Sequence, residues 1–243
     1  VNVVALRRPQ LDLTIPSTIA VALADARPDI VVSAAAYTAV DKAESEPDLA
    51  RAINATAPGV LAREAAACGA WLVQYSTDYV FSGAGSTPWT EDDPTGPLNV
   101  YGQTKLEGEQ LIRASGCRHL IFRTSWVYAS RGNNFSRTML RLAGERDSLA
   151  VIDDQHGAPT GADLLADVTA HALAAATRRP ALAGTYHVAA SGETTWHGYA
   201  SHVIEFARAT GRPLRVTPTA IHPVASSAFA TAARFSVNDT AAT

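Results

Sequence analysis

WLVQYST (71–77) and HLIFRTS (119–125) are short runs rich in β-branched and aromatic residues, and between them residues from about 100 to 115 show helical periodicity. A strand, a helix and a second strand in this order are typical of parallel sheets, in which a helix returns the chain to the start of the next strand. The stretch DIVVSAAA (29–36) is apolar throughout, as expected of a strand buried on both faces. These runs predict an α/β fold built on a doubly wound parallel sheet.

The same alternation extends in both directions from this unit. Further strands are predicted at residues 1–6 and 149–152, and further helices at 14–26, 47–57, 58–68 and 135–146. After Gln155 the pattern changes to a loop rich in glycine and proline, a helix at 162–176, a short strand at 184–190 and a helix at 197–210. We therefore predict a first domain over residues 1–155, whereas residues 156–243 should form mainly a smaller C-terminal lobe.

The composition narrows the class of partner. The chain has 243 residues, 47% of them hydrophobic, and a formal net charge of -3. This balance provides no basic surface for a nucleic acid, so a small ligand is the expected partner. Charged residues interrupt every apolar stretch before it reaches roughly 18 residues, and no membrane span is expected. Because Cys68 and Cys117 are the only cysteines, no disulfide framework is expected, and a reducing, cytoplasmic location is predicted.

Tyr101 and Lys105 are the strongest chemical signal, because residues four apart lie on one face of a helix. A cation beside a phenol favours the tyrosinate, so we expect Lys105 to lower the pKa of Tyr101 from its ordinary value of about 10. The hydroxyl would then donate a proton near neutral pH, which is general acid catalysis. Taken alone, the spacing favours a solvent-exposed pair, because tyrosine and lysine fall four apart by chance in many helices.

Thr77 and Asp78 favour the catalytic interpretation, because they stand at the end of the predicted strand 71–77, where α/β sheets bind ligands. The Thr77 hydroxyl would hydrogen-bond a substrate carbonyl oxygen, although a hydroxyl at a strand end also serves simply to turn the chain. A hydroxyl, a phenol and an ammonium group together can polarise a ketone and protonate the alkoxide formed when a hydride arrives. The sequence thus indicates a carbonyl reductase.

Five sequence blocks, in order, resemble one family. They are AAAYTAVDKAESEP (34–47), YSTDYVF (75–81), NVYGQTKLEGE (99–109), RTSWVY (123–128) and DQHGAPTGAD (154–163). From about residue 28 to at least residue 200 the chain is similar to the dTDP-4-dehydrorhamnose reductases, which belong to the extended short-chain dehydrogenases. The resemblance implies a Rossmann-like NAD(P)-binding domain and a substrate-binding lobe. It also implies reduction of the 4-keto group of dTDP-4-dehydro-L-rhamnose by NAD(P)H to give dTDP-L-rhamnose.

The resemblance gives roles to residues at matching positions. Tyr101 would donate the proton, and Lys105 would hold the nicotinamide ribose. The implied substrate contacts are Thr77, Asp78 and Trp126, and the implied cofactor contacts are Ala36, Tyr37, Thr38, Tyr75, Tyr101 and Lys105. Trp126 has an equally ordinary alternative as a core aromatic residue, because tryptophan is usually largely buried.

The amino-terminal stretch departs from the family pattern. No G-x-x-G-x-x-G turn, which would cradle a pyrophosphate at a helix N-terminus, occurs in the sequence. Because VNVVAL (1–6) aligns best with the second strand of the family, we expect one βα unit to be missing before it. The tail FATAARFSVNDTAAT (229–243) resembles the corresponding family segment with some residues lost near Arg234 and Phe235.

Two arginines bear on the choice of cofactor. Arg7 and Arg8 follow the predicted strand 1–6, and arginine at this place accommodates the 2′-phosphate of NADP. We therefore expect NADPH as the cofactor, with NADH as the alternative. By resemblance, Asp12 and Leu13 lie close to the adenine.

A metal and a second subunit are implied only by the resemblance. The histidines lack metal-ligand spacing, so a catalytic zinc is not expected. Some family members bind magnesium through acidic residues at a dimer interface, and Asp163 matches one such position, which implies a homodimer. An acidic residue near the start of a helix explains Asp163 equally well.

Two other functions stay open at this point. A nucleotide-sugar epimerase or dehydratase shares the fold and the Tyr-x-x-x-Lys pattern but retains bound NAD, and Asp78 would supply its additional acid or base. The second is a non-catalytic protein, since a relative of this family serves as a regulatory subunit of methionine adenosyltransferase. The presence of Thr77, Tyr101 and Lys105 together favours an active enzyme.

Overall fold

The computed structural model describes residues 2–85, 87–229 and 231–233. Its main sheet has four parallel strands in the spatial order β1-β2-β3-β8. The strands are β1 (Ile30–Ser33), β2 (Trp71–Thr77), β3 (Arg118–Thr124) and β8 (Gly184–His187). The α/β fold with a Rossmann-like parallel sheet, predicted from the alternating runs, is confirmed.

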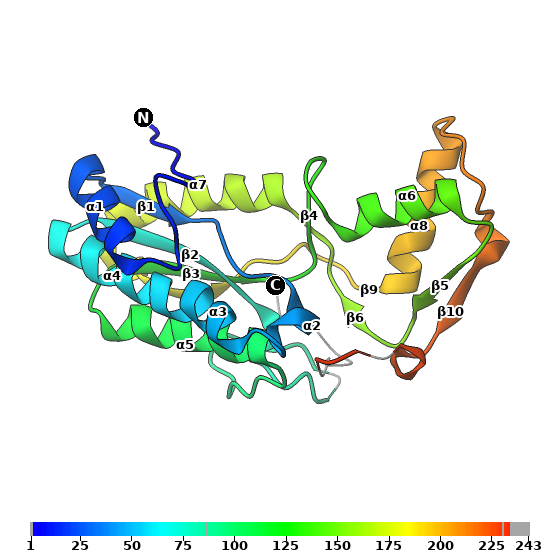
Figure 1. The fold of residues 1–243 in the computed structure, drawn as a ribbon, viewed down its shortest axis with the longest axis horizontal. Helices are drawn as coiled ribbons and strands as arrows, with labels where there is room; N and C mark the ends of the chain where they lie inside the picture. The colour runs from blue at the N-terminus through cyan, green and yellow to red at the C-terminus, as the bar shows by residue number, and fades with distance from the viewer. Residues whose placement is uncertain (1, 86, 230, 234–243) are drawn as a thin grey trace.

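Helices cover both faces of this sheet (Figure 1). One face packs against α1 (Pro16–Ala26), α4 (Ala57–Cys68) and α5 (Val100–Ala114), and the other packs against α7 (Ala162–Arg178). Successive strand residues point to opposite faces, so Leu72 belongs to the first core and Val73 to the second. The helical stretch before α4 consists of α2 (Val40–Ala43), α3 (Pro47–Arg51) and a π-helical turn, η1 (Ala52–Thr56).

A second lobe lies at the right of Figure 1, with its own apolar core. Helices α6 (Phe135–Glu145) and α8 (Trp196–Ala209) pack there with the parallel pair β5 (Leu149–Ile152) and β10 (Ile221–Val224). Two short ladders lie between the lobes in the chain: β4 (Val127–Tyr128) with β7 (Thr160–Gly161), and β6 (His156–Gly157) with β9 (Thr194–Thr195). The described 3-10 turns are η2 (Asp78–Val80), η3 (Pro180–Leu182), η4 (Pro218–Ala220) and η5 (Ser226–Ala228).

The two lobes do not follow the predicted division at residue 155. Elements α6 and β5 were expected in the first domain but pack in the second lobe. Strand β8, expected in the second lobe, belongs to the main sheet, and α7 covers one face of that sheet. The prediction of a boundary was wrong because it followed chain order. Strand β5 pairs with β10, whose residues stand far along the chain, and a local apolar run does not reveal so distant a partner.

The amino-terminal strand is a second correction. Residues 2–6 have no regular secondary structure, and Val3 and Val4 are exposed, so the predicted strand 1–6 is wrong over the residues that the structure describes. A β-branched run forms a strand only where a neighbouring strand pairs with its backbone. The tail 229–243 was expected to resemble the family; residue 230 and residues 234–243 of that tail lie outside the described residues. Among the helices that the structure describes, none combines the length and the apolarity needed to cross a bilayer.

Candidate active site

The carboxyl ends of the parallel strands bring the predicted site residues to one edge of the main sheet. Thr77 at the end of β2 is in register with Thr124 at the end of β3, and Ser33 at the end of β1 is in register with Gln74. Asp78 directly follows Thr77 in the chain. Open α/β sheets bind their ligands outside this edge, so the location is suited to a substrate and a cofactor.

Helix α5 carries Tyr101 to the same edge. Its first turn is capped by Asn99, whose Oδ1 accepts a hydrogen bond of 2.8 Å from the Gly102 amide. A Cβ atom at Gly102 would lie 2.2 Å from the carbonyl oxygen of Tyr79, so the close approach of the helix to the end of β2 requires glycine. The ring of Tyr101 meets that of Tyr79 edge-on, with centroids 5.7 Å apart.

Thr77, Asp78 and Tyr101 form one polar group, in which Thr77 and Asp78 are buried and Tyr101 is half-buried. The Thr77 hydroxyl donates to Asp78 Oδ1 over 2.9 Å, and the Tyr79 amide donates to Thr77 Oγ1 over 3.2 Å. Burial raises the pKa of Tyr101 to about 12; a hydrogen bond with Thr77 opposes the rise, and the negative charge of Asp78 adds to it. Tyr101 therefore keeps its proton at neutral pH and acts as a donor.

Lys105 lies one helical turn after Tyr101 and is 4% exposed. Its ammonium donates a hydrogen bond of 2.6 Å to the carbonyl oxygen of Tyr75. Burial lowers the pKa of Lys105 to about 8, although the carboxylate of Glu109 opposes this change. The expected lowering of the Tyr101 pKa by Lys105 is therefore wrong, because desolvation of the phenol dominates its titration.

Asn54 is a site residue that the sequence analysis missed. It is buried on the π-helical turn η1, where its Oδ1 accepts from the Tyr37 amide over 2.9 Å and its Nδ2 donates to the Tyr37 carbonyl over 3.0 Å. Its Nδ2 also lies 3.3 Å from Thr104 Oγ1 on α5. Asn54 thus ties the turn after β1 to the catalytic helix. An asparagine inside a helical stretch, where it is only weakly favoured, was the available signal.

The residues expected to line the cofactor differ in their surroundings. Ala36 and Thr38 are exposed on the turn after β1, and Tyr37 between them is half-buried. The Tyr75 hydroxyl shares a hydrogen bond of 2.8 Å with Thr169 Oγ1, so this side chain lies on the α7 face of the sheet. The cofactor contacts of these residues stay predictions.

The amino-terminal candidates form a small turn before α1. Arg7 and Arg8 are exposed, and Arg8 Nε lies 2.9 Å from Asp12 Oδ2. Asp12 Oδ1 accepts hydrogen bonds from the amide and the hydroxyl of Thr14, over 2.9 and 2.7 Å. Leu13 packs against the core beneath α1 and α4. These contacts give Asp12 and Leu13 structural roles, and their predicted contact with adenine stays a prediction.

Trp126 stands just beyond β3 with a left-handed backbone, at φ 44°. Its ring stacks on that of Trp196, with centroids 3.5 Å apart, and a Cβ atom at Gly157 would come within 2.5 Å of it. This packing agrees with the core-aromatic alternative. Trp126 nevertheless lies two residues after Thr124, the last residue of β3, and so stays close to the edge of the sheet where ligands bind. Contact with the substrate stays a prediction.

Asp163 is exposed in the first turn of α7, where a negative charge is favoured by the helix dipole. In the described part of the chain, no three histidine, cysteine or acidic residues gather in a way that would hold a metal ion. The residues of one subunit therefore do not by themselves fit a magnesium ion, and no step is derived through one.

The polar groups at the sheet edge fit a nicotinamide nucleotide. An ammonium group has three N–H donors, and among the described residues Lys105 donates to one acceptor, the Tyr75 carbonyl. Thr124 Oγ1 and Trp126 Nε1 are buried and have no hydrogen-bond partner among the described residues. Buried polar atoms are normally satisfied, so this edge is suited to a polar ligand. Lys105 and Tyr101 are the candidates to hold a ribose and its nicotinamide.

Comparison with known proteins agrees across nearly the whole chain. Residues 1–240 match the family model described as RmlD substrate binding domain. The dTDP-4-dehydrorhamnose reductase of Escherichia coli (strain K12) is 56% identical over 223 residues, which cover 92% of this chain and 74% of that protein. The corresponding protein of Burkholderia thailandensis is 48% identical over 241 residues, covering 98% of this chain and 81% of that protein. The crystal structure of dTDP-4-dehydrorhamnose reductase from Bacillus anthracis in complex with NADP has a TM-score of 0.85 and 35% identity, covering 96% of this chain and 79% of that one. On these matches, the chain belongs to the dTDP-4-dehydrorhamnose reductase family.

Proposed function

We propose that the protein reduces the 4-keto group of dTDP-4-dehydro-L-rhamnose with NAD(P)H and yields dTDP-L-rhamnose. The observation that carries the proposal is the gathering of Thr77, Tyr101 and Lys105 at the carboxyl edge of the sheet. The names of the relatives from E. coli and B. thailandensis support the substrate, and the NADP complex from B. anthracis supports the cofactor.

Tyr101 is the proposed proton donor. The bound cofactor would supply a hydride to the carbonyl carbon. As negative charge grows on the carbonyl oxygen, the Tyr101 hydroxyl passes its proton to that oxygen, and the Thr77 hydroxyl hydrogen-bonds the same atom. A phenol with a pKa of about 12 stays protonated until a base as strong as an alkoxide forms beside it. The buried carboxyl group of Asp78 reinforces this, since its charge disfavours the tyrosinate.

Lys105 is the proposed anchor of the nicotinamide ribose. Its remaining N–H donors are suited to ribose hydroxyls, and the bond to the Tyr75 carbonyl fixes the direction of the side chain. We propose NADPH as the preferred cofactor, with the exposed Arg7 and Arg8 available to its 2′-phosphate. Comparing kcat/KM for NADPH and NADH in the parent and in an Arg7→Ala, Arg8→Ala variant tests this preference.

A cytoplasmic location and a homodimer belong to the same proposal. Cys68 and Cys117 are both free thiols, as expected in a reducing compartment. In the homodimer, Asp163 would be one of the acidic residues that bind magnesium at the subunit interface. Sedimentation in the presence and absence of magnesium tests the homodimer and the role of the metal. A monomer under both conditions would contradict both.

The decisive experiment supplies the protein with dTDP-4-dehydro-L-rhamnose and NADPH and follows the absorbance of the reduced nicotinamide. We expect stoichiometric oxidation of the cofactor. Tyr101→Phe should abolish turnover while keeping the fold and cofactor binding. Tyr186→Phe is a matched control, because in the described part of the chain that hydroxyl donates to a backbone carbonyl, that of Leu182, over 2.8 Å. No oxidation of either NADPH or NADH by the parent protein would refute the proposal.

An epimerase or dehydratase is the second candidate, and the burial of Asp78 beside Thr77 is the observation in its favour. Such an enzyme would convert its nucleotide sugar with no net consumption of added cofactor and would be purified with bound NAD. The regulatory alternative predicts cofactor binding without turnover. Product analysis in the same assay separates all three outcomes.

A further inference from the structure

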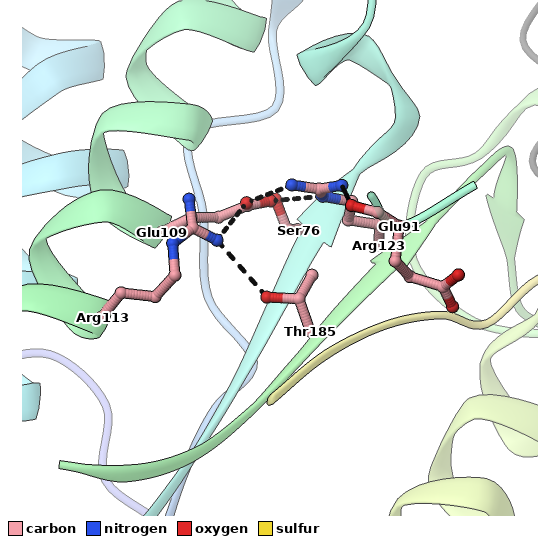
Figure 2. A network of polar contacts seen from close by, with 6 residues as sticks. All are labelled: Ser76, Glu91, Glu109, Arg113, Arg123 and Thr185. Carbon is pink, nitrogen blue, oxygen red and sulfur yellow. Dashed lines mark hydrogen bonds and ion pairs between the residues drawn. The ribbon is translucent and has the colours of Figure 1, made fainter. Parts of the chain in front are cut away.

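Figure 2 shows a buried ion-pair network that the proposed reaction does not use. Its centre is Glu109, which is 1% exposed and lies opposite Arg123, which is 3% exposed. Glu109 Oε1 accepts from Ser76 Oγ over 2.6 Å and from Arg123 Nε over 3.0 Å. Glu109 Oε2 accepts from the terminal nitrogens of Arg123 and Arg113, over 2.8 and 3.1 Å. Both carboxylate oxygens are thus fully engaged.

The network is connected to the catalytic residues on two sides. Tyr101, Lys105 and Glu109 follow one another at intervals of four residues on α5, so they share one helix face. On β2, Ser76 is the residue directly before Thr77. One carboxylate therefore holds the helix that carries the proton donor and the strand end that carries the substrate hydroxyl.

Arg123 extends the network to the strand-end loop, residues 81–85 and 87–98. Its NH1 donates to the Glu91 carbonyl over 3.3 Å, and its guanidinium lies 5.1 Å from the centroid of the Phe81 ring. Phe81 in turn stacks on Trp89, with centroids 5.0 Å apart. The Glu91 side chain accepts a further bond of 2.8 Å from the amide of His187 on β8. The loop is thus fastened at several points along its length.

Stability alone does not account for this arrangement. Burial raises the pKa of Glu109, and the bonds and charge of Arg123 more than offset it, so the group remains a carboxylate. Two charges taken out of water offer little net stability, and apolar residues of similar volume are often as good or better. What an ion pair with two parallel N–H bonds adds is a fixed geometry.

We propose that the Glu109–Arg123 pair is a positioning device that holds the strand-end loop and the end of β2 in register with Tyr101. The proposal rests on the proposed reductase function for its effect on turnover, but not for its effect on the loop. Arg123 and Glu109 act through Tyr101 and Thr77 and do not touch the reacting atoms.

The test replaces the polar network with apolar residues of similar size, in the triple variant Ser76→Ala, Glu109→Leu, Arg123→Met. A stabilising role predicts that this variant, once folded, keeps its activity. The positioning role predicts a thermal midpoint close to that of the parent, with kcat lower by about 10- to 100-fold, because small misplacements of catalytic groups have effects of this size. Because Glu109→Leu also removes a charge that favours protonated Lys105, the dissociation constant of NADPH is compared at pH 6, where it should stay within about twofold of that of the parent. Amide exchange at residues 87–98 should quicken by about tenfold or more.

A second variant covers failure of the triple variant to fold. Arg123→Lys keeps the charge but loses the two-point contact with Glu109 and the reach to Glu91. Its control is Arg141→Lys, which alters an exposed ion pair on α6 whose atoms lie 2.7 Å apart. We expect faster loop exchange and slower turnover for Arg123→Lys, and parental values for Arg141→Lys.

The outcomes separate the two proposals. A folded variant of the network with loop exchange and turnover within about twofold of the parent would overturn the positioning role. If the parent itself does not reduce the nucleotide sugar, the proposed function fails, and loop exchange in the variants still decides whether the pair orders the loop.

Discussion

Replacing Lys105 with methionine is expected to stabilise the protein at pH 7 while abolishing turnover. Lys105 is 4% exposed, and burial lowers its pKa to about 8 from an ordinary 10.5. At 1.36 kcal/mol per pKa unit, the buried ammonium destabilises the folded protein by about 3 kcal/mol. Loss of the bond to the Tyr75 carbonyl destabilises the variant by about 1 kcal/mol. That carbonyl still accepts a hydrogen bond of 2.9 Å from Gln74 Nε2. The expected gain in the free energy of unfolding is about 2 kcal/mol.

The dependence of this gain on pH supplies a second test of the same reasoning. Between about pH 8 and pH 10.5, folded Lys105 has lost its proton while the unfolded chain still carries it. The unfolded state then binds more protons, so the parent gains stability as pH rises through this window. The methionine variant has no such titration. Its advantage should therefore shrink by about 2 to 3 kcal/mol between pH 7 and pH 10 and vanish or reverse.

Urea unfolding of both proteins at pH 7 and pH 10 measures the difference, because every other titrating group is common to the two proteins and cancels. Lys42 is the only other lysine in the sequence, and its side chain is 64% exposed, so Lys42→Met is a matched control. It should change the free energy of unfolding by about 0.5 kcal/mol or less at either pH. A Lys105→Met variant that is less stable than the parent at pH 7, or whose advantage is the same at both pH values, would refute the reasoning.

Three further outcomes are expected. Gly102→Ala should cost about 1 to 3 kcal/mol and reduce turnover, because its Cβ would lie 2.2 Å from a backbone carbonyl oxygen; Gly144→Ala on α6 meets nothing within 4 Å and should instead stabilise by about 0.5 to 1 kcal/mol, as urea midpoints will reveal. Gly157→Ala should displace the Trp126 ring, which would lie 2.5 Å from the new Cβ, and shift tryptophan fluorescence together with KM for the nucleotide sugar; a spectrum like that of the parent would contradict the close packing. The pH profile of kcat/KM should fall above about pH 8, where Lys105 loses its charge, and a profile flat to pH 10 would show that this charge does not matter for binding.

The parts of the molecule that the sequence predicts well are those set by neighbours in the chain. Strand β2 begins and ends at the predicted residues 71 and 77, and α5 ends one residue before the predicted end, because apolar runs and an asparagine cap are local signals. The meeting of Thr77 with Tyr101 also follows from local rules, since a strand end and the first turn of the next helix lie at the same edge of a parallel sheet.

The parts that could not be predicted depend on partners far apart in the chain. Nothing in the run 149–152 indicates that it pairs with β10 in the second lobe rather than with the main sheet. The bonds of Asn54 to Tyr37, and of Glu109 to Arg123, join elements whose contact exists only after folding. The direction of the Tyr101 pKa shift was wrong for the same reason, because desolvation is a property of the packed structure and spacing in the sequence says nothing about it.

The raised pKa of Tyr101 and the lowered pKa of Lys105 together change what each residue contributes. A phenol with a pKa of about 12 carries its proton at neutral pH, so in the free protein Tyr101 is ready to donate a proton without any effect of Lys105. Lys105 has the opposite difficulty, since burial favours its neutral form and only a charged ammonium retains all three donors. The carboxylate of Glu109, four residues further along the same helix face, opposes that loss of charge. The buried network therefore serves the site in two ways, because the Glu109 charge that bonds Arg123 and orders the loop also favours the charged form of Lys105.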